Sequence, residues 1–361
     1  TMSTSGHCLR RSHIKPDFET CLLAVQDISD PADTNETFLA LRERYPEALP
    51  LVRTAREEES RLLSDFRPDF VFYNKSYDQY LPPYLRSAAV AEYAKVCYCT
   101  YCFFGTLWAI TEVYSKTFAR NVSLFFADTP LTADCNRARF KKAHAAGLMK
   151  SLSVGYPMLG EMAQYRRDQD PRFHILWTPR WSTASEVYGS NFFEYKDKIL
   201  AYARREKDVT LTFRPHPLLF YHFQQTGQLT QAQADAYLAQ YQQEERIRCD
   251  RAPEYLQQFA DADVLVSDIS SMVMEFSFLG KPLIFCDTGG RMDGLYARLV
   301  EGAYMTRSWE EVAQTLNMLR RGEDPMKEKR LAVRKEVFGD HFDHIPQHFM
   351  AELQKSFRGD P

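Results

Sequence analysis

The chain has 361 residues, about twice what one hydrophobic core usually serves, so we expect two domains of roughly 150 to 200 residues each. Apolar residues make up 45% and charged residues 26% of the chain, which excludes a disordered or fibrous protein. With 45 Lys and Arg against 48 Asp and Glu, the net charge is -3, so no overall positive field exists to hold nucleic acid. Glycine is scarce at 15 residues, and neither of the glycine-rich phosphate-binding motifs G-x-G-x-x-G and G-x-x-x-x-G-K-[ST] occurs. Any phosphate must therefore be bound by another kind of site.

The eight cysteines lie mostly in apolar runs and lack the paired spacings of a zinc module, so we expect free thiols and a cytosolic protein. The single C-x-x-C, formed by Cys99 and Cys102, has no second ligand pair, and we expect no metal there. The start of the chain does not resemble a secretory signal. The most apolar stretch, 96–110, is too short and too polar to span a bilayer, so we expect no transmembrane helix.

Short β-branched or aromatic runs alternate with longer helical patterns along the whole chain, which predicts an α/β fold with parallel sheets. In the first half we predict strands at 21–25, 69–73, 96–101 and 123–127, and helices at 34–44, 53–66 and 131–146. A turn at 154–157 precedes a polar stretch at 165–172, so we place a domain boundary there. Residues 1–165 then form an N-terminal Rossmann-like domain whose opening strands look abbreviated.

The second half shows the same alternation more clearly. We predict strands at 174–178, 209–213, 263–267 and 282–286, and helices at 229–243, 309–320 and 326–338. Residues 166–340 then form a second Rossmann-like domain, and 341–361 form a C-terminal helix that packs back on the first domain. The histidines at 341, 344 and 348 are spaced for a polar helix face, which we prefer to a metal site.

Polar side chains follow the predicted strands of the second domain, and in an open parallel sheet ligands bind at the carboxyl ends of the strands. Thr178 and Arg180 follow the first strand in a proline turn. Arg214 and His216 follow the next strand, where two prolines stiffen the turn and fix their offset. Because Arg provides bidentate donors and His donates a hydrogen bond or a proton near neutral pH, this pair suits a phosphate that leaves.

A third group of polar residues follows the strand at 263–267. The apolar spacing over 272–279 predicts a helix, so Ser270 and Ser271 lie at a helix N-terminus, where backbone N–H groups and the helix dipole bind anions. Asp268, at the strand end, belongs to the same group of donor-binding candidates. The alternative is that Ser270 only caps the helix. Glu275 lies one turn further on, within reach of a sugar hydroxyl.

The segments T-P-R-W (178–181), R-P-H-P (214–217), S-D-I-S-S (267–271) and F-L-G-K-P (278–282) resemble the C-terminal domain of the CDP-glycerol glycerophosphotransferases. These are GT-B-fold enzymes that build teichoic-acid and related phosphopolymers. The resemblance extends from about residue 155 to about residue 319. It implies two Rossmann-like domains that face a cleft, with the acceptor on the side of 1–165 and a nucleotide-linked donor bound by 166–340.

The resemblance also implies roles for individual residues. His216 would assist departure of the nucleotide phosphate, and Ser270 and Ser271 would hold the pyrophosphate. Glu275 would contact the ribose, at a place where Asp is common. No metal or other cofactor would be needed, because cationic side chains and a helix N-terminus replace a divalent ion.

The first half departs from the family pattern. Members usually carry a His in a Q-T-W-H-G-T-like strand end, thought to deprotonate the acceptor hydroxyl, whereas residues 98–106 here read Y-C-T-Y-C-F-F-G-T. The Gly and Thr are retained and the His is absent. Asp78, which follows the predicted strand at 69–73, is our candidate base, with an ordinary loop Asp as the alternative. The sequence therefore leaves the acceptor unidentified.

We expect a cytoplasmic transferase that moves glycerol phosphate, or a similar polyol phosphate, from a CDP-linked donor to a glycan, lipid-linked or polymer acceptor and releases CMP. The chemistry is phosphoryl transfer by positioning and charge stabilisation. A lipid-linked acceptor leaves open a peripheral contact with the inner face of the plasma membrane. Two alternatives remain: a GT-B glycosyltransferase that uses a nucleotide sugar, and a nucleotide-binding module without turnover.

Overall fold

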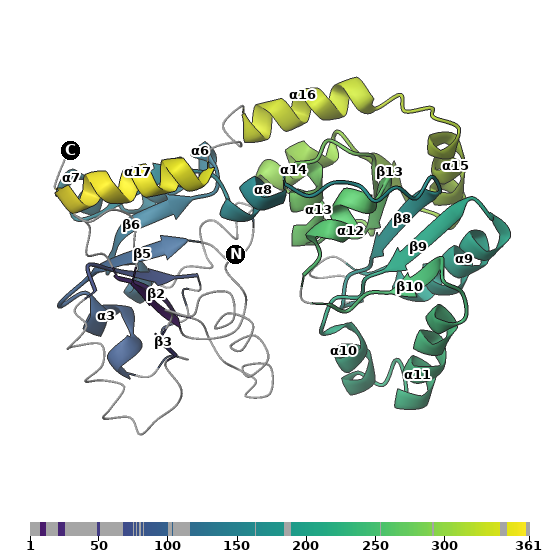
Figure 1. Ribbon diagram of the computed structural model, residues 1–361, viewed down its shortest axis with the longest axis horizontal. Coiled ribbons are helices and arrows are strands. Elements are labelled where there is room, and N and C mark those ends of the chain that lie inside the picture. The colour runs from purple at the N-terminus through teal and green to yellow at the C-terminus, as the bar shows by residue number, and fades with distance from the viewer. Residues whose placement is uncertain are drawn as a thin grey trace. The chain divides into compact units, whose positions relative to one another are not determined.

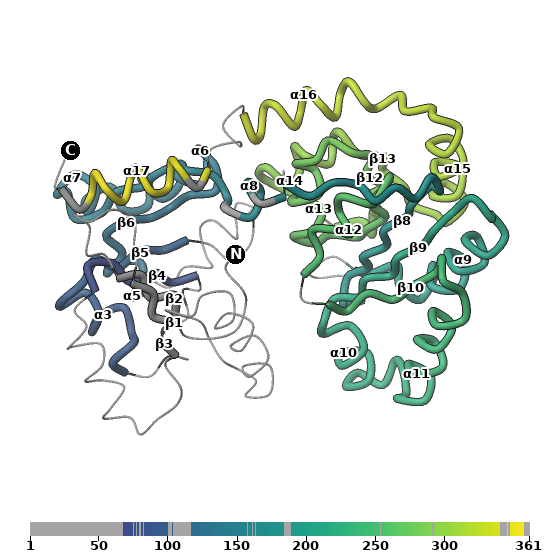
Figure 2. Tube along the Cα trace, in the orientation of Figure 1, coloured from purple at the N-terminus to yellow at the C-terminus, as the bar shows by residue number. Residues whose placement is uncertain are grey.

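The computed structural model describes residues 8–11, 21–25 and 49–50, and residues 68–358 without 75, 77, 79–80, 82, 100–102, 104–115, 163, 184–188, 253, 291 and 340–344 (Figure 2). The predicted helices at 34–44 and 53–66 lie outside the described residues. The chain divides into two compact units: unit 1 is Thr1–Met158 with Asp343–Pro361, and unit 2 is Leu159–Phe342.

The sheet of unit 1 is parallel except at one edge. Its strands lie in the order β3-β1-β2-β4-β5-β6-β7, and β1 (Cys8–Arg11) is antiparallel to both β2 (Cys21–Val25) and β3 (Leu49–Pro50). The remaining parallel strands are β4 (Phe70–Tyr73), β5 (Lys95–Cys99), β6 (Val122–Ala127) and β7 (Lys150–Ser153). The four strands predicted for the first half are confirmed to within two residues at each end.

Both faces of this sheet are covered, which explains why its strands are continuous apolar runs. On one face, Tyr73 and Tyr98 pack edge-on against Phe118. On the other face, Phe126 stacks on Phe349 of α17 at 4.1 Å between ring centroids. The α-helices that the structure describes in unit 1 are α3 (Ser87–Val90), α5 (Lys116–Ala119), α6 (Pro130–Arg139), α7 (Lys141–Ala145) and α17 (Ile345–Arg358). The helix predicted at 131–146 is divided at Phe140, whose dihedral angles, φ -113° and ψ 35°, are not helical.

Unit 2 contains a fully parallel sheet in the order β10-β9-β8-β11-β12-β13 (Figure 1). In chain order within the unit this is 3-2-1-4-5-6, the order of a doubly wound Rossmann sheet. Its strands are β8 (Phe173–Thr178), β9 (Val209–Phe213), β10 (Ile247–Cys249), β11 (Val264–Ser267), β12 (Leu283–Cys286) and β13 (Tyr304–Thr306). The four predicted strands are confirmed, whereas β10 and β13, each three residues long, were not predicted.

The helices of unit 2 cover this sheet and complete its core. Trp177 of β8 stacks on Phe192 of α9 and packs against Phe213 of β9, with centroids 5.9 and 4.8 Å apart. The helices are α9 (Phe192–Arg205), α10 (Leu219–Gln225), α11 (Gln231–Ala239), α12 (Leu256–Asp261), α13 (Ser271–Ser277), α14 (Gly294–Val300), α15 (Trp309–Arg320) and α16 (Lys327–Phe338), and the short α8 (Pro157–Met162) precedes them at the boundary between the units. The helices predicted at 309–320 and 326–338 are confirmed. The one predicted at 229–243 is shorter and ends in a 3-10 turn, Gln240–Gln242.

Two further observations concern the helices and the cysteines of the described residues. None of the helices that the structure describes is long and apolar enough to cross a membrane. Five cysteines carry free thiols: Cys97, Cys99, Cys135, Cys249 and Cys286. Burial raises the pKa of Cys99 to about 12, so this side chain stays a protonated thiol. Cys102, the other residue of the C-x-x-C, lies outside the described residues.

Candidate active site

Three turns of unit 2 bring most of the predicted site residues to one edge of the sheet. The turns follow β9, β8 and β11, which are neighbours in the sheet, and they carry Arg214 and His216, Thr178 and Arg180, and the segment 268–271. The strand order reverses between β8 and β11, and at such a switch point an open sheet forms a crevice outside the carboxyl ends of its strands. The fold therefore places the candidates where a doubly wound sheet binds its ligand.

Thr178 joins the ends of β8 and β11. Its Oγ1 donates to Ser267 Oγ at 2.8 Å, and the Ser267 hydroxyl lies 2.8 Å from the Thr178 carbonyl, to which it donates. Both residues are buried. We expected Thr178 to bind the donor, and the structure shows its hydroxyl bonded to Ser267 at the joined ends of the two strands.

Asp268 organises the turns around it. Its carboxylate is 2% exposed and accepts hydrogen bonds from Arg180 N at 3.0 Å, Ser190 Oγ at 3.0 Å, Asn191 Nδ2 at 3.1 Å and Asn191 N at 3.3 Å. Burial raises the pKa of Asp268 to about 6, although these hydrogen bonds act in the opposite direction. Asp268 is therefore unsuited to the phosphate contact we expected, and it fixes the backbone that carries Arg180.

Arg180 and His216 lie close together beside Trp181. The Arg180 guanidinium carbon and the His216 ring lie 5.9 and 6.0 Å from the Trp181 ring centroid, and Arg180 Nη1 bonds the Ile269 carbonyl at 3.4 Å. His216 is exposed as a whole residue, but the protein around its ring partly desolvates it, and this desolvation and the Arg180 charge lower the pKa of His216 below its ordinary value. His216 Nδ1 accepts from Leu218 N at 3.1 Å, so in the neutral ring Nε2 carries the proton. At neutral pH this imidazole is a hydrogen-bond donor next to a cation.

Arg214 has a different environment from the one we expected. Its backbone N donates to the Trp177 carbonyl at 2.8 Å, which prolongs the pairing of β8 and β9. Its guanidinium bonds Asp250 Oδ2 at 2.5 Å and the Ala252 carbonyl at 2.7 Å, and its side chain is 12% exposed. A carboxylate therefore balances its charge, so Arg214 anchors the turn that presents His216.

The N-terminus of α13 carries the two serines. Ser270 is the N-cap residue, but its hydroxyl accepts no capping hydrogen bond; it lies 3.4 Å from Ser267 Oγ instead. Its backbone N donates to Tyr296 Oη at 3.0 Å. Ser271 is exposed. The alternative that Ser270 serves only as a helix cap is not supported.

Glu275 lies on the buried side of α13. It is 2% exposed, and its Oε2 accepts from Tyr255 Oη at 2.6 Å. Burial raises the pKa of Glu275 to about 7. The structure thus shows the Glu275 carboxylate enclosed by protein and bonded to Tyr255.

Asp78, the candidate base, belongs to unit 1. Its two carboxylate oxygens accept from Ser87 N at 2.9 Å and from Ser87 Oγ at 2.5 Å, so it anchors the start of α3. The segment 98–106, in which the resemblance led us to look for an acceptor His, lies mostly outside the described residues.

Several residues that shape the site were not predicted from the sequence. Asp250 and Tyr255 come from the loop between β10 and α12, and Ser190 and Asn191 precede α9. An Asn directly before the apolar spacing of 192–203 is an N-cap signature, which could have revealed α9 and these two partners. Nothing in the sequence around 250–255 identifies partners of Arg214 and Glu275.

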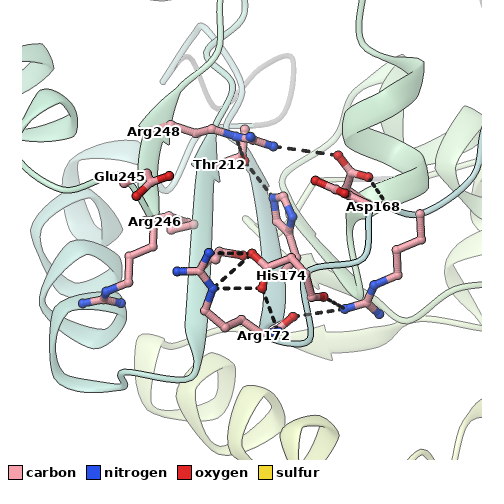
Figure 3. Close-up of a pocket in the computed structure, with 12 residues that line it drawn as sticks. Asp168, Arg172, His174, Thr212, Glu245, Arg246 and Arg248 are labelled. Atoms are coloured by element: carbon pink, nitrogen blue, oxygen red, sulfur yellow. Dashed lines mark hydrogen bonds and ion pairs between the residues drawn. The ribbon is translucent and has the colours of Figure 1, made fainter.

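A second feature of unit 2 lies at the opposite, amino-terminal edge of the sheet. A pocket of about 180 Å³ is lined there by residues of β8, β9, β10 and the segment before β8 (Figure 3). Its charged groups pair with one another: Arg172 with Asp170 at 2.7 Å, and Arg248 with Asp261 at 3.9 Å. Arg248 Nε also donates to Thr212 Oγ1 at 2.9 Å. Burial and Arg248 lower the pKa of His174, whose Nε2 lies 2.8 Å from the same hydroxyl, to about 4. This internal pairing favours an ion-pair network over a ligand site.

Comparisons with solved structures show the fold. The wall teichoic acid polymerase TagF superposes with a TM-score of 0.59 at 14% identity, over 94% of this chain and 89% of that one. A TagF variant soaked with CDPG gives 0.56 at 14% identity, over 94% and 88%. The UDP-GlcNAc 2-epimerase from Neisseria meningitidis bound to UDP-GlcNAc gives 0.51 at 14% identity, over 84% and 80%. The chain thus has a GT-B-like fold, as predicted.

Comparison by sequence identifies the family. No curated protein matches the chain. The model of the CDP-glycerol:poly(glycerophosphate) glycerophosphotransferase family matches residues 140–339, more than half of the chain, and this range includes all three turns of the site. The chain therefore belongs to the CDP-glycerol:poly(glycerophosphate) glycerophosphotransferase family of enzymes.

Proposed function

We propose that this enzyme transfers glycerol phosphate, or a similar polyol phosphate, from a CDP-linked donor to a glycan, lipid-linked or polymer acceptor and releases CMP. The acceptor hydroxyl oxygen attacks the phosphorus of the polyol phosphate, and the bond to the bridging pyrophosphate oxygen breaks. The acceptor proton passes to a base, and the bridging oxygen leaves as part of CMP. Protein catalysis of such a step consists mostly of positioning and of stabilising charge.

The donor pyrophosphate is assigned to the crevice between the turns after β8, β9 and β11. Arg180 supplies a cation, and His216 Nε2–H donates to the leaving phosphate oxygen. The hydroxyls of Ser270 and Ser271 and the backbone N–H of Ser271 contribute donors from the start of α13, whereas the Ser270 backbone N–H already donates to Tyr296. Asp268 and Arg214 hold these groups in place without touching the donor. Glu275, assigned to the ribose by analogy, keeps this role only if α13 shifts when the donor binds.

One observation carries the proposal most directly: His216 and Arg180 converge beside Trp181 at the switch point of the sheet. An approaching anion finds one fixed cation and one neutral N–H donor there. Because a bound phosphate raises the pKa of a neighbouring imidazole, donor binding itself favours protonation of His216. His216 is thereby able to donate a proton as the pyrophosphate bond breaks.

The acceptor side rests on Asp78, which we retain as the candidate base. Its bonds to Ser87 fix the orientation of the carboxylate, as catalysis requires, but they also occupy both oxygens. We propose a cytoplasmic location because the sequence lacks paired cysteine spacings and the cysteines Cys97, Cys99, Cys135, Cys249 and Cys286 are free thiols. A lipid-linked acceptor would further bring it to the inner membrane face, which co-sedimentation with anionic vesicles tests.

The experiment is an assay of CMP release from CDP-glycerol and CDP-ribitol in the presence of candidate acceptors, followed by mass analysis of the product. We expect His216→Ala to reduce the rate by about 10²-fold or more, as for loss of a general acid. His222→Ala is the matched control, because His222 contacts the same Trp181 ring from α10, with centroids 4.9 Å apart. Absence of CMP from every donor, or an unchanged rate in His216→Ala, contradicts the proposal.

Two alternatives predict other outcomes. A nucleotide-sugar transferase would be stabilised more by UDP- or GDP-linked sugars than by CDP-linked polyols in a thermal-shift comparison. The likeness to a UDP-GlcNAc 2-epimerase gives this alternative its support, at the level of the fold. A binding module without turnover would bind CDP tightly and form no product with any acceptor.

A further inference from the structure

Tyr255 contacts two separate motifs of the donor site, although it belongs to neither. It lies directly before α12, at the end of the loop that follows β10. Its Oη donates to Glu275 Oε2 on α13 at 2.6 Å, and its ring centroid lies 5.0 Å from the guanidinium carbon of Arg214. One side chain therefore links the helix that carries the serine pair to the turn that carries His216.

The surroundings of Tyr255 reinforce both contacts. The loop that ends at Tyr255 also supplies Asp250 Oδ2 and the Ala252 carbonyl to the Arg214 guanidinium, at 2.5 and 2.7 Å. On the other side, the Tyr255 ring packs edge-on against Phe259 at 5.2 Å, and Phe259 packs edge-on against Phe276 of α13 at 5.3 Å. The loop thus contacts Arg214 at three points and α13 at Glu275, and Phe259 of α12 adds a contact to the neighbouring Phe276.

We propose that Tyr255 is a positioning residue of the donor site, which sets the location of His216 through Arg214 and that of Ser270 and Ser271 through Glu275. The inference rests on the proposed function, since it assumes that these groups bind the donor. Tyr255 itself does not touch the donor. Its two contacts are separable: the hydroxyl acts on α13, whereas the ring acts on the turn after β9.

The two contacts should have different kinetic effects. Tyr255→Phe removes the hydroxyl and keeps the ring, so we expect the KM for CDP-glycerol to rise about tenfold while kcat stays within about twofold. Tyr255→Leu also removes the face on which Arg214 packs, so we expect kcat to fall about tenfold in addition. Tyr304→Phe is the matched control, because it removes a similar phenol–carboxylate bond, to Asp324 at 2.7 Å, away from the three turns. A general loss of stability would alter all three variants alike.

A second measurement does not depend on the identity of the donor. Hydrogen exchange of backbone amides in the full-length protein should become faster in Tyr255→Phe over 270–277 alone. In Tyr255→Leu it should become faster over both 214–219 and 270–277, and in Tyr304→Phe over neither segment. Unchanged exchange in both segments of Tyr255→Leu overturns the proposal, as does an unchanged KM in Tyr255→Phe. Failure of the proposed function is a separate result, in which the wild-type enzyme releases no CMP while the exchange data still decide the role of Tyr255.

Discussion

Replacement of Asp268 by Asn separates the organisation of the donor site from the stability of the fold. The variant keeps the size and shape of the side chain and changes one acceptor oxygen into a donor. Arg180 N, Ser190 Oγ and the Asn191 amide all donate to this carboxylate, so they cannot all remain satisfied. The backbone of Arg180 then loses its fixed position at the mouth of the crevice.

Two opposing effects on stability can be compared. Burial raises the pKa of Asp268 from 3.8 to about 6, so at pH 7 the ionised carboxylate makes the folded state about 3 kcal/mol less stable than an unperturbed group would, at about 1.36 kcal/mol per pKa unit. Asn avoids this penalty but leaves a buried donor without its acceptor, which costs about 1–3 kcal/mol. We therefore expect the unfolding midpoint of Asp268→Asn to change by less than about 5 °C at pH 7, while the donor KM rises about tenfold.

The contribution of Asp268 to stability should also change with pH in a definite direction. The folded pKa of Asp268 lies above the unfolded value, so its stabilising effect is complete below about pH 4 and is lost as the pH rises through about 6. Asp268→Asn lacks this loss, and its unfolding free energy relative to wild type should increase by about 3 kcal/mol between pH 4 and 7. Asp208→Asn is the control with the opposite sign, because Arg320 lowers the pKa of Asp208. Denaturant unfolding between pH 4 and 7 measures this change, and a donor titration at pH 7 measures the KM. The reasoning is refuted if the stability of Asp268→Asn depends on pH as that of wild type does, or if its KM equals that of wild type.

Three further predictions follow from the described contacts. Glu275→Gln should gain stability relative to wild type as the pH rises from about 4.5 to about 7, because burial raises the pKa of Glu275 to about 7. Denaturant unfolding at pH 5 and pH 8 measures this gain, and an equal difference in unfolding free energy between variant and wild type at both pH values would contradict it. His216 should stay neutral in the free enzyme from pH 7 to pH 8, because desolvation of the ring and the Arg180 charge lower its pKa. A kcat/KM profile should therefore show no titration of this ring in that range, and a step that disappears in His216→Ala would contradict this. Asp78→Asn keeps one acceptor oxygen for Ser87, so we expect the free energy of unfolding to fall by about 1 kcal/mol. If Asp78 is the base, kcat should also fall about 10²-fold, and a wild-type kcat in a folded variant would remove Asp78 from the mechanism.

Much of the fold could be predicted because the apolar patterns, turns and helix caps that define its elements lie within short stretches of sequence. Strands such as β9 and β11 are apolar runs bounded by turns, and α15 begins with an N-cap Ser308 and has regular apolar spacing. The strands β10 and β13 carry only three residues each, too few for a periodic pattern. Their place in the sheet depends on tertiary pairing, which one sequence does not reveal.

The positions of the site residues were predictable, but their contacts were not. Prolines and strand ends place Arg214 and Asp268 at the correct edge of the sheet. Whether such a side chain faces a ligand or the protein depends on partners far along the chain. Asp250 balances Arg214 from 36 residues away, and Asn191 engages Asp268 from 77 residues away. These contacts turn two expected donor ligands into residues that hold the site together.

The central claim is that the turns after β8, β9 and β11 bind a CDP-linked donor and that His216 assists departure of CMP. The most direct measurement is CMP release from CDP-glycerol by wild type, His216→Ala and His222→Ala under identical conditions. The account predicts release by wild type and His222→Ala, and a rate about 10²-fold lower for His216→Ala. Equal release by all three proteins, or none from wild type with any acceptor, would contradict it.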